Sequence, residues 1–421
     1  MRNFSKILFL IGLAFLTACQ RNIFQSPTVS PSSLRDVSAL KLNFRFEPDV
    51  PAPSAAAEPQ ANEERIQAVQ SDFDANRPQE VLDKTIVSPD KKRVLAVYHK
   101  TDDATAEFRL DMYSADGRLL RKISPNGLAV HFPDTIVWSP DGNNVAFVGQ
   151  TRRSIQATAE PTPALTEPTP DANADTNVDA NTEANTNAAP PTTAATPEAP
   201  ANVLTFSTEQ LYLCNTDGGD LKPITQNQGL IYFYFVWAPD SSALVTLAAT
   251  YTEWEIGRNQ SEQRMEIYIP AGRPRLVEKT GRIRLLDDNL TKVRPVWSPD
   301  SAKVAVAFEK DVRVYDAIGD VPTQAAIPLK NQLLLSSQKF DDELRRKELG
   351  ANAPPANTEV STLPDENMLV SFNPITELEW TEPAMLYLQT GYVREMKNSA
   401  DSARSYLRWH RLIFSPQAVA L

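Results

Sequence analysis

One short pattern recurs along this chain of 421 residues and constrains its fold more than any other feature. An apolar stretch that usually ends in Trp is followed by a Pro-Asp turn and then by a second apolar stretch. Four copies are clear and a fifth is degenerate: Ile86–Asp90, Val137–Gly142, Val236–Asp240, Val296–Asp300 and Leu378–Pro383. Because one such unit cannot bury its own apolar surface, the repeats predict a ring or stack of similar sheets.

The best copy, Ser139-Pro140-Asp141-Gly142, has the residues that a type I turn prefers at each of its four positions. Apolar and β-branched residues follow it, and a third and a fourth short strand with their own turns can be traced after most copies. Four antiparallel strands in roughly forty to fifty residues are typical of a propeller blade. The run Ile231–Trp237 is apolar throughout, so we expect the first strand of a blade to be buried on both faces.

These motifs resemble the TolB-type β-propeller repeat, a bacterial relative of the WD-type repeat with a Trp-Ser-Pro-Asp-Gly core. The resemblance runs from about Leu82 to Phe414, apart from two insertions. It implies an all-β propeller of about five four-stranded blades. Six blades are the alternative, and the alternating segment Ala39–Phe46 could close the last blade and so remove exposed sheet edges.

The repeated aspartates and tryptophans each allow two interpretations. A ring of aspartates could bind a ligand, but their place in a recurring turn favours hydrogen bonds to the backbone. The tryptophans could form a ligand cage, but their spacing favours packing between blades. We therefore assign structural roles to the repeat residues, namely Pro89, Asp90, Trp138, Pro140, Asp141, Trp237, Pro239, Asp240, Trp297, Pro299, Asp300 and Trp380.

The N-terminal residues predict export and a lipid anchor. Basic Arg2 and Lys6 precede the apolar run Ile7–Ala18, which is too short to span a membrane and is typical of a signal peptide. The sequence ending in Cys19 resembles a bacterial lipobox, which implies cleavage after residue 18 and lipidation of Cys19. The alternative is an ordinary signal peptide with a chance cysteine. Gln20 implies, by resemblance to proteobacterial lipoproteins, an outer-membrane location facing the periplasm.

The rest of the chain divides by composition. We expect a flexible tether at 19–36, then a strand, a Pro/Ala linker and a short helix within 37–81, and a propeller at 82–421. A disordered insertion (154–201) and a partly helical one (331–373) interrupt the propeller. The first insertion holds seven acids and no base, so it explains most of the net charge of −11, and nothing indicates nucleic-acid binding.

Residues that could carry chemistry are few. Three histidines are scattered, and the two cysteines, Cys19 and Cys214, form no metal-ligand pair. No phosphate-binding loop or nucleophile motif is present in the sequence. We therefore expect no cofactor, no bound metal and no enzymatic activity, with Cys214 as a small buried residue.

Three segments could bind a protein partner. The first is a C-terminal cluster that includes Arg404, Arg408, Trp409 and Arg411. The second is Glu253–Glu255 in a long loop, and the third is a helix at Gln332–Leu349; for each, a solvated surface is the alternative. The sequence favours a lipid-anchored scaffold that binds an envelope protein. A propeller enzyme or a carbohydrate-binding protein that uses the central channel is the other possibility.

Overall fold

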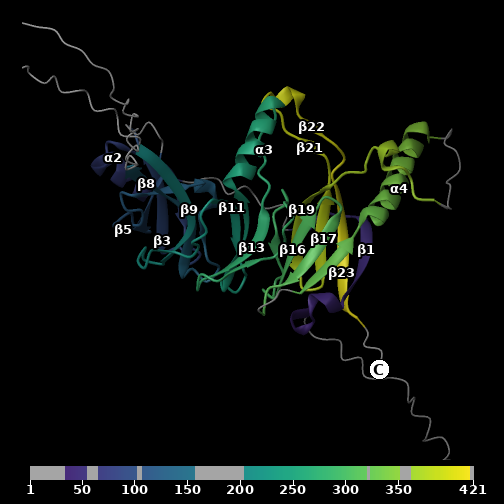
Figure 1. Cartoon of the computed structure of the whole chain (residues 1–421), viewed down its shortest axis with the longest axis horizontal. Coiled ribbons are helices and arrows are strands. Elements are labelled where there is room, and N and C mark those ends of the chain that lie inside the picture. The colour runs from purple at the N-terminus through teal and green to yellow at the C-terminus, as the bar shows by residue number, and fades with distance from the viewer. Residues whose placement is uncertain are drawn as a thin grey trace, which may run out of the picture. The chain divides into compact units, whose positions relative to one another are not determined.

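The computed structural model describes residues 34–54, 65–101, 107–156, 203–319, 323–350 and 362–417 (Figure 1). Most of the predicted insertion 154–201 lies outside these ranges. The described part is mainly antiparallel sheet, most of it in four-stranded units, which agrees with an all-β fold. The chain forms two compact units, which we call the α2 unit (Arg65–Ile136 and Val145–Gly229) and the β1 unit (Met1–Glu64, Val137–Asn144 and Leu230–Leu421).

The α2 unit holds one helix and two sheets, with strand orders β2-β3-β4-β5 and β10-β9-β8-β6. Its elements are α2 (Gln67–Asn76), β2 (Glu80–Val87), β3 (Arg93–Lys100), β4 (Arg109–Ser114), β5 (Leu119–Lys122), β6 (Leu128–His131), η4 (Pro133–Thr135), β8 (Asn144–Gln156), β9 (Val203–Asn215) and β10 (Lys222–Pro223). Val69 and Phe73 on one face of α2 are buried against β3 and β4, as expected for an amphipathic helix.

The β1 unit holds three four-stranded sheets, ordered β11-β12-β13-β14, β15-β16-β17-β18 and β1-β23-β20-β19, and the hairpin β21-β22. Its strands are β1 (Leu42–Val50), β7 (Val137–Trp138), β11 (Leu230–Trp237), β12 (Ala243–Thr250), β13 (Arg273–Glu278), β14 (Ile283–Leu285), β15 (Val296–Trp297), β16 (Lys303–Phe308), β17 (Asp311–Asp316), β18 (Gln324–Pro328), β19 (Ile375–Glu382), β20 (Met385–Thr390), β21 (Val393–Arg394), β22 (Ala403–Arg404) and β23 (Arg408–Pro416). Its helices are η1 (Leu34–Asp36), η2 (Ala39–Lys41), α3 (Tyr251–Gln263), α4 (Lys330–Leu349), η6 (Glu366–Met368) and η7 (Ser399–Asp401).

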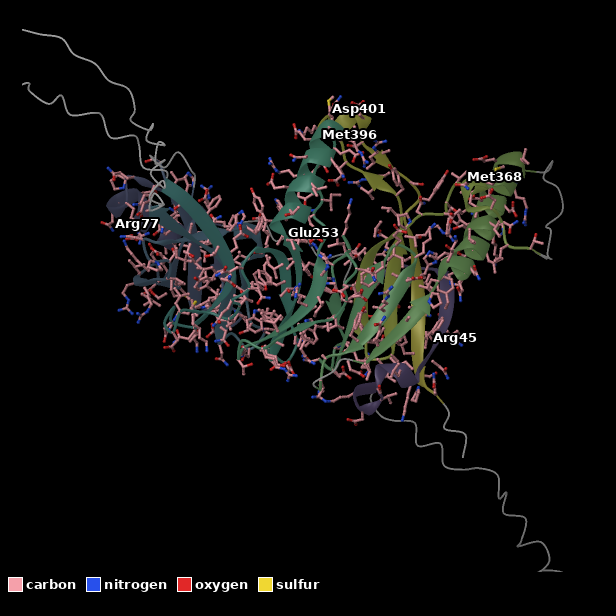
Figure 2. All side chains as sticks on the ribbon, in the orientation of Figure 1. Arg45, Arg77, Glu253, Met368, Met396 and Asp401 are labelled. Carbon is pink, nitrogen blue, oxygen red and sulfur yellow. The ribbon has the colours of Figure 1, made fainter. Side chains whose placement is uncertain are left out.

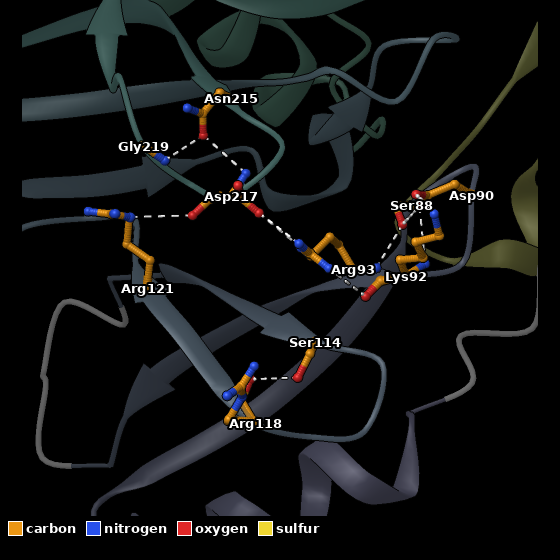
Figure 3. Close-up of polar contacts among 10 residues, drawn as sticks. All are labelled: Ser88, Asp90, Lys92, Arg93, Ser114, Arg118, Arg121, Asn215, Asp217 and Gly219. Atoms are coloured by element: carbon orange, nitrogen blue, oxygen red, sulfur yellow. Dashed lines mark hydrogen bonds and ion pairs between the residues drawn. The ribbon is translucent and has the colours of Figure 1, made fainter.

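The recurring turn is closed by its own side chains. In the first copy, Ser88 Oγ donates to Asp90 Oδ1 (2.7 Å), and the same oxygen of Asp90 accepts from the Lys92 N–H (3.1 Å) (Figure 3). The Arg93 N–H donates to Ser88 Oγ (2.9 Å), which fixes the start of the next strand. Asp141, Asp240 and Asp300 accept the same backbone bond two residues on. These carboxylates are thus engaged in the turns that connect the first and second strands.

The residue after each turn aspartate has a left-handed backbone. Lys91, Gly142, Ser241 and Ser301 have φ of 61°, 71°, 62° and 60°. In the β1 unit this position also joins consecutive turns, because the Asp141 N–H donates to Ser241 Oγ (3.1 Å) and the Asp240 N–H donates to Ser301 Oγ (2.9 Å). Serine therefore offsets its backbone strain with a hydrogen bond, whereas Lys91 has an exposed side chain and no such bond among the described contacts.

Strand burial differs from expectation in one respect. The sequence predicts that the first strand of each sheet is buried on both faces, but half of the β11 residues are only half-buried. The continuously buried strands are the second ones, β3, β12 and β16. The reason is position: β11 is an edge strand, whereas β12 lies between β11 and β13 and packs on both faces.

An ion pair joins the two sheets of the α2 unit. Asn215 Oδ1 accepts from the N–H groups of Asp217 and Gly219 and so shapes the turn between β9 and β10 (Figure 3). Asp217 then accepts from Arg93 Nη2 (2.9 Å) through its carboxylate and from Arg121 Nε (3.3 Å) through its carbonyl. Both arginines come from the other sheet, so a tight turn of one sheet is held by cations of its neighbour.

A buried cation fixes the N-terminal segment to the strands of the β1 unit. Lys303 Nζ lies at 2.6 Å from both the Val37 carbonyl and Asp316 Oδ1, and its side chain is buried. Asp316 also accepts from the Ala39 N–H (2.9 Å). These contacts hold η1 and η2, and β1 then pairs antiparallel with β23 as the edge strand of the last sheet.

Replacing Lys91 with Gly should raise the free energy of unfolding by about 0.5–1 kcal/mol, because Gly adopts a left-handed backbone without strain. Lys92, one residue on, is the matched control: Lys92→Gly should lower it by about as much through lost chain entropy. Urea unfolding followed by circular dichroism measures both. Equal destabilisation by the two glycines would show that the left-handed position carries no strain.

Candidate functional site

Helix α3 follows β12, where the sequence predicts a long loop. Thr250 caps α3 by a capping box: its hydroxyl accepts from the Glu253 N–H (3.2 Å), and Glu253 Oε2 accepts from the Thr250 N–H (2.9 Å). Glu253 also binds Arg273 of β13 with both carboxylate oxygens (2.7 and 2.8 Å). Burial raises the pKa of Glu253, but the hydrogen bonds from the Thr250 N–H and from Arg273 outweigh it and hold that pKa below its ordinary value. Glu253 therefore sets where α3 begins and how it leaves the sheet.

Aromatic residues pack the near face of α3. The ring of Trp254 lies between Phe233 (centroids 5.5 Å apart) and Tyr268 (5.1 Å, edge to face). Gly257 lies so close to the Tyr268 ring that a Cβ there would come within 2.8 Å of it. The predicted partner-binding residues Glu253 and Trp254 are thus engaged in contacts within the chain.

The hairpin β21-β22, an insertion between β20 and β23, lies against the segment that follows α3. The Ile267 N–H donates to the Glu395 carbonyl (2.8 Å), and the Lys397 N–H donates to the Met265 carbonyl (2.9 Å). Ion pairs Arg394–Glu266 and Lys397–Glu262 add to these bonds. We call α3, residues 264–270 and residues 393–404 together the arm. Figure 2 shows Glu253 toward the sheets and Met396 and Asp401 at the far end.

The arm presents apolar side chains to solvent. None of the α3 residues is fully buried. The exposed apolar residues are Tyr251 (62% exposed), Ile256 (52%), Met265 (62%), Ile267 (49%) and Ile269 (38%). Single exposed apolar residues are ordinary, but several on one projecting element are typical of a surface that binds another protein.

The four residues of the predicted C-terminal binding cluster differ in their exposure and in their contacts. Arg404 is exposed in β22, and Trp409 is half-buried. Arg408 is 5% exposed and binds Asp49 of β1 by two hydrogen bonds of 2.6 and 2.9 Å. Arg411 is half-buried and pairs with Glu47, also of β1. Arg408 and Arg411 therefore add side-chain contacts between β23 and its neighbouring strand β1.

Arg408 also holds helix α4. Its guanidinium donates to three serine hydroxyls, those of Ser336 and Ser337 in α4 and of Ser371, and lies 4.4 Å from the Phe340 ring centroid. Helix α4 occupies the segment where the sequence predicts a helix at Gln332–Leu349, and it ends before Gly350. One buried cation thus connects β1, β23 and α4.

The repeat tryptophans and Cys214 are buried in the structure. Trp138, Trp237, Trp297 and Trp380 are each at most 7% exposed. Cys214 is buried, and burial raises the pKa of its thiol to about 12. Within the described ranges no cluster of three or more His, Cys, Asp or Glu could hold a metal, and no helix is long and apolar enough to cross a membrane. Cys19 and the signal peptide lie outside the described residues.

Comparisons with known proteins give weak structural likenesses. No family model and no curated protein matches the sequence. The solved structures that align include a eukaryotic initiation factor (8% identity, 80% of this chain and 58% of that chain, TM-score 0.35) and prolyl oligopeptidase B from Galerina marginata (9%, 88% and 45%, 0.37). Tricorn protease also aligns (10%, 63% and 26%, 0.29). The chain spans about half the length of the first two, and at these TM-scores the matches assign no activity.

The comparisons contradict the prediction that the chain is not an enzyme, because peptidases recur among the aligned structures. That prediction depended on the lack of local sequence motifs. Catalytic groups can instead converge from separate parts of a chain, where no local motif records them. An absence of motifs is therefore no basis for excluding catalysis.

Replacing Arg408 with Met should lower the free energy of unfolding by about 3 kcal/mol, because Asp49 and the buried serine hydroxyls lose their common partner. Arg404→Met, in the exposed hairpin, should change it by less than about 0.5 kcal/mol. Chemical denaturation of both variants measures the difference. Equal effects would show that the Arg408 contacts do not stabilise the fold.

Acid should weaken the same region through His410, which is fully buried. The Asp49 N–H donates to its Nδ1 (3.2 Å), so the ring is neutral, and burial lowers its pKa from 6.5 to about 4. Between these values the unfolded chain binds a proton that the folded chain does not, so stability is full above 6.5 and falls toward 4. The loss is on the order of 3 kcal/mol. His410→Gln should remove this part of the pH dependence in urea unfolding, and an unchanged profile would exclude His410 as its source.

Proposed function

We propose that this chain is a lipid-anchored β-propeller of the bacterial cell envelope that binds a partner protein through its arm. The repeated Pro-Asp turns and the four-stranded antiparallel sheets support a TolB-like propeller. The sequence around Cys19 supports the lipid anchor and the export to the envelope. The observation that carries the binding function is the arm, whose apolar side chains are exposed.

The construction of the arm supports this role. Two insertions from different sheets join by backbone hydrogen bonds and ion pairs, which stiffens an element that would otherwise be a pair of loops. Stiffening lowers the entropy cost of binding, and exposed Ile, Met and Tyr supply the apolar contact. The packing of Trp254 and Gly257 leaves Ile256 on the outer side of α3.

The place of the N-terminal segment agrees with an anchored orientation. Within the β1 unit, Figure 1 shows the purple turns η1 and η2 at the end opposite the arm. A lipid on Cys19 would tether the chain fifteen residues before Leu34, where the described structure begins. On this proposal the arm faces away from the membrane and toward soluble or membrane-spanning partners in the envelope.

Photo-crosslinking in intact cells tests the arm directly. A photoreactive residue at Ile256 or Ile267 of the full-length chain should give adducts with the same envelope protein. A photoreactive residue at Leu40, which is also exposed but lies at the opposite end, should not. Ile256→Asp should weaken the captured complex by about tenfold or more, because buried interface anchors cost above 1 kcal/mol when lost.

Two results would contradict the proposal. One is the same set of adducts from Leu40 as from the arm, which would indicate random encounters. The other is an unweakened complex with Ile256→Asp. Thermal unfolding of Ile256→Asp, expected to match the parent because the residue is half-exposed, separates lost binding from lost folding.

A further inference from the structure

Strand β5 is the open edge of its sheet in the α2 unit. The strand order is β2-β3-β4-β5, so β4 pairs with β5 on one side and no described strand pairs with it on the other. Backbone groups on an open edge can pair with the strand of another chain. The edge strands β10 and β18 each contain a proline, which cannot donate a backbone hydrogen bond, whereas β5 contains none. Strand β5 can therefore accept a further strand.

Two residues of β5 direct their backbone groups away from β4. The carbonyl of Arg118 and the N–H of Ile123 both form hydrogen bonds with β4. Because bonded and non-bonded residues alternate along an antiparallel pair, Leu119 and Lys122, next to these residues, face outward. A bulge in β5 places these two opposite residues of β4 that are separated by only one residue. Their outward groups are therefore spaced as on a regular strand.

Exposed side chains make this edge basic. Arg118, Arg121 and Lys122 are all exposed. Arg121 Nε donates to the Asp217 carbonyl on one face of the sheet (3.3 Å) (Figure 3). Among the described residues, no carboxylate lies within ion-pair distance of any of the three cations. An incoming strand therefore meets positive side chains along the whole edge.

The acids in electrostatic range of these cations are already engaged. Asp116, which is near Arg118, accepts a hydrogen bond from a hydroxyl of its own turn. Asp111, which is near Lys122, is buried and binds Arg77 Nη2 (2.7 Å). Charge complementarity therefore favours a partner strand that carries acids and disfavours a basic one.

A pocket of about 380 Å³ opens beside the two outward-facing residues, Leu119 and Lys122. The end of α2 and the chain that leads into β2 form its other wall. Arg77 fixes this wall, because its guanidinium lies 3.6 Å from Asp72 and 3.2 Å from Glu80. An added strand alternates its side chains between the two faces of the sheet, so alternate residues lie beside this polar pocket.

We propose that β5 accepts an extended acidic segment of a partner protein as a fifth strand of its sheet. Backbone hydrogen bonds to Leu119 and Lys122 supply affinity, and carboxylates beside Arg121 and Lys122 supply specificity. All of these residues belong to the α2 unit. The inference therefore stands apart from the lipid anchor and from the arm.

Residue-resolved amide hydrogen exchange in the full-length chain tests strand addition. The probe is a capped peptide of about eight residues that alternates Val and Glu, at millimolar concentration. It should slow exchange at the Leu119 and Lys122 N–H groups by about tenfold or more, because both become hydrogen-bonded. The N–H of Ile123, which is already bonded to β4, is the internal control and should change little.

Matched probes and variants separate charge from backbone pairing. A probe with Lys in place of Glu should give no protection, and high salt should weaken the acidic probe. A probe with methylated backbone nitrogens keeps its charge but cannot donate to the edge, so it should bind at least about tenfold more weakly. Lys122→Gln should weaken the acidic probe by about fivefold, whereas Lys222→Gln on the exposed edge strand β10 should not.

Four results would overturn the inference. Binding of the acidic probe without protection of Leu119 and Lys122 would show that acids gather on a basic surface without forming a strand. Equal binding of the methylated probe would show the same. Equal binding of the Lys probe would remove the role of charge, and no binding of the acidic probe would show that the charged edge only prevents pairing. Circular dichroism of Lys122→Gln, expected to match the parent, separates lost binding from lost folding.

Discussion

The rest of the structure depends on the hydrogen bond between a turn aspartate and the backbone two residues further on. In four of the sheets this bond closes the turn before the second strand, and the residue after the aspartate has a left-handed backbone. In the β1 unit the serines with a left-handed backbone also connect consecutive turns. Ser241 and Ser301 each accept a hydrogen bond from the backbone of the preceding turn. A short local motif therefore aligns neighbouring sheets as well as closing its own turn.

The segments that differ most from the repeat lie in the connections between strands. The arm and α4 are both made from connections between strands. Charged groups fix each of them: Glu253 with Arg273 for the arm, and Arg408 with Asp49 for α4. Lys303 with Asp316 does the same for the N-terminal segment. Ion pairs with little exposure hold geometry well, because removing one partner leaves the other unpaired.

Sequence reasoning found the antiparallel sheets because turn and strand patterns are local. The sequence predicts a loop at Glu253–Glu255, although Thr250 followed three residues later by Glu253 is the pattern of a capping box and so indicates a helix. The burial of Arg408 could not be predicted from the sequence, because its partner Asp49 lies 359 residues away along the chain. The absence of local motifs likewise gives no ground for excluding an enzyme.

The central claim is that a lipid on Cys19 holds one end of the β1 unit at the membrane and leaves the arm facing away. Energy transfer to headgroup-labelled vesicles tests it, with a fluorophore on Leu40→Cys or Met265→Cys in the lipidated full-length protein. Cys214 does not compete for the label, because it is buried and its thiol pKa is raised to about 12. Transfer should be strong from residue 40 and weak from residue 265. Equal transfer from both, or stronger transfer from residue 265, would contradict this orientation.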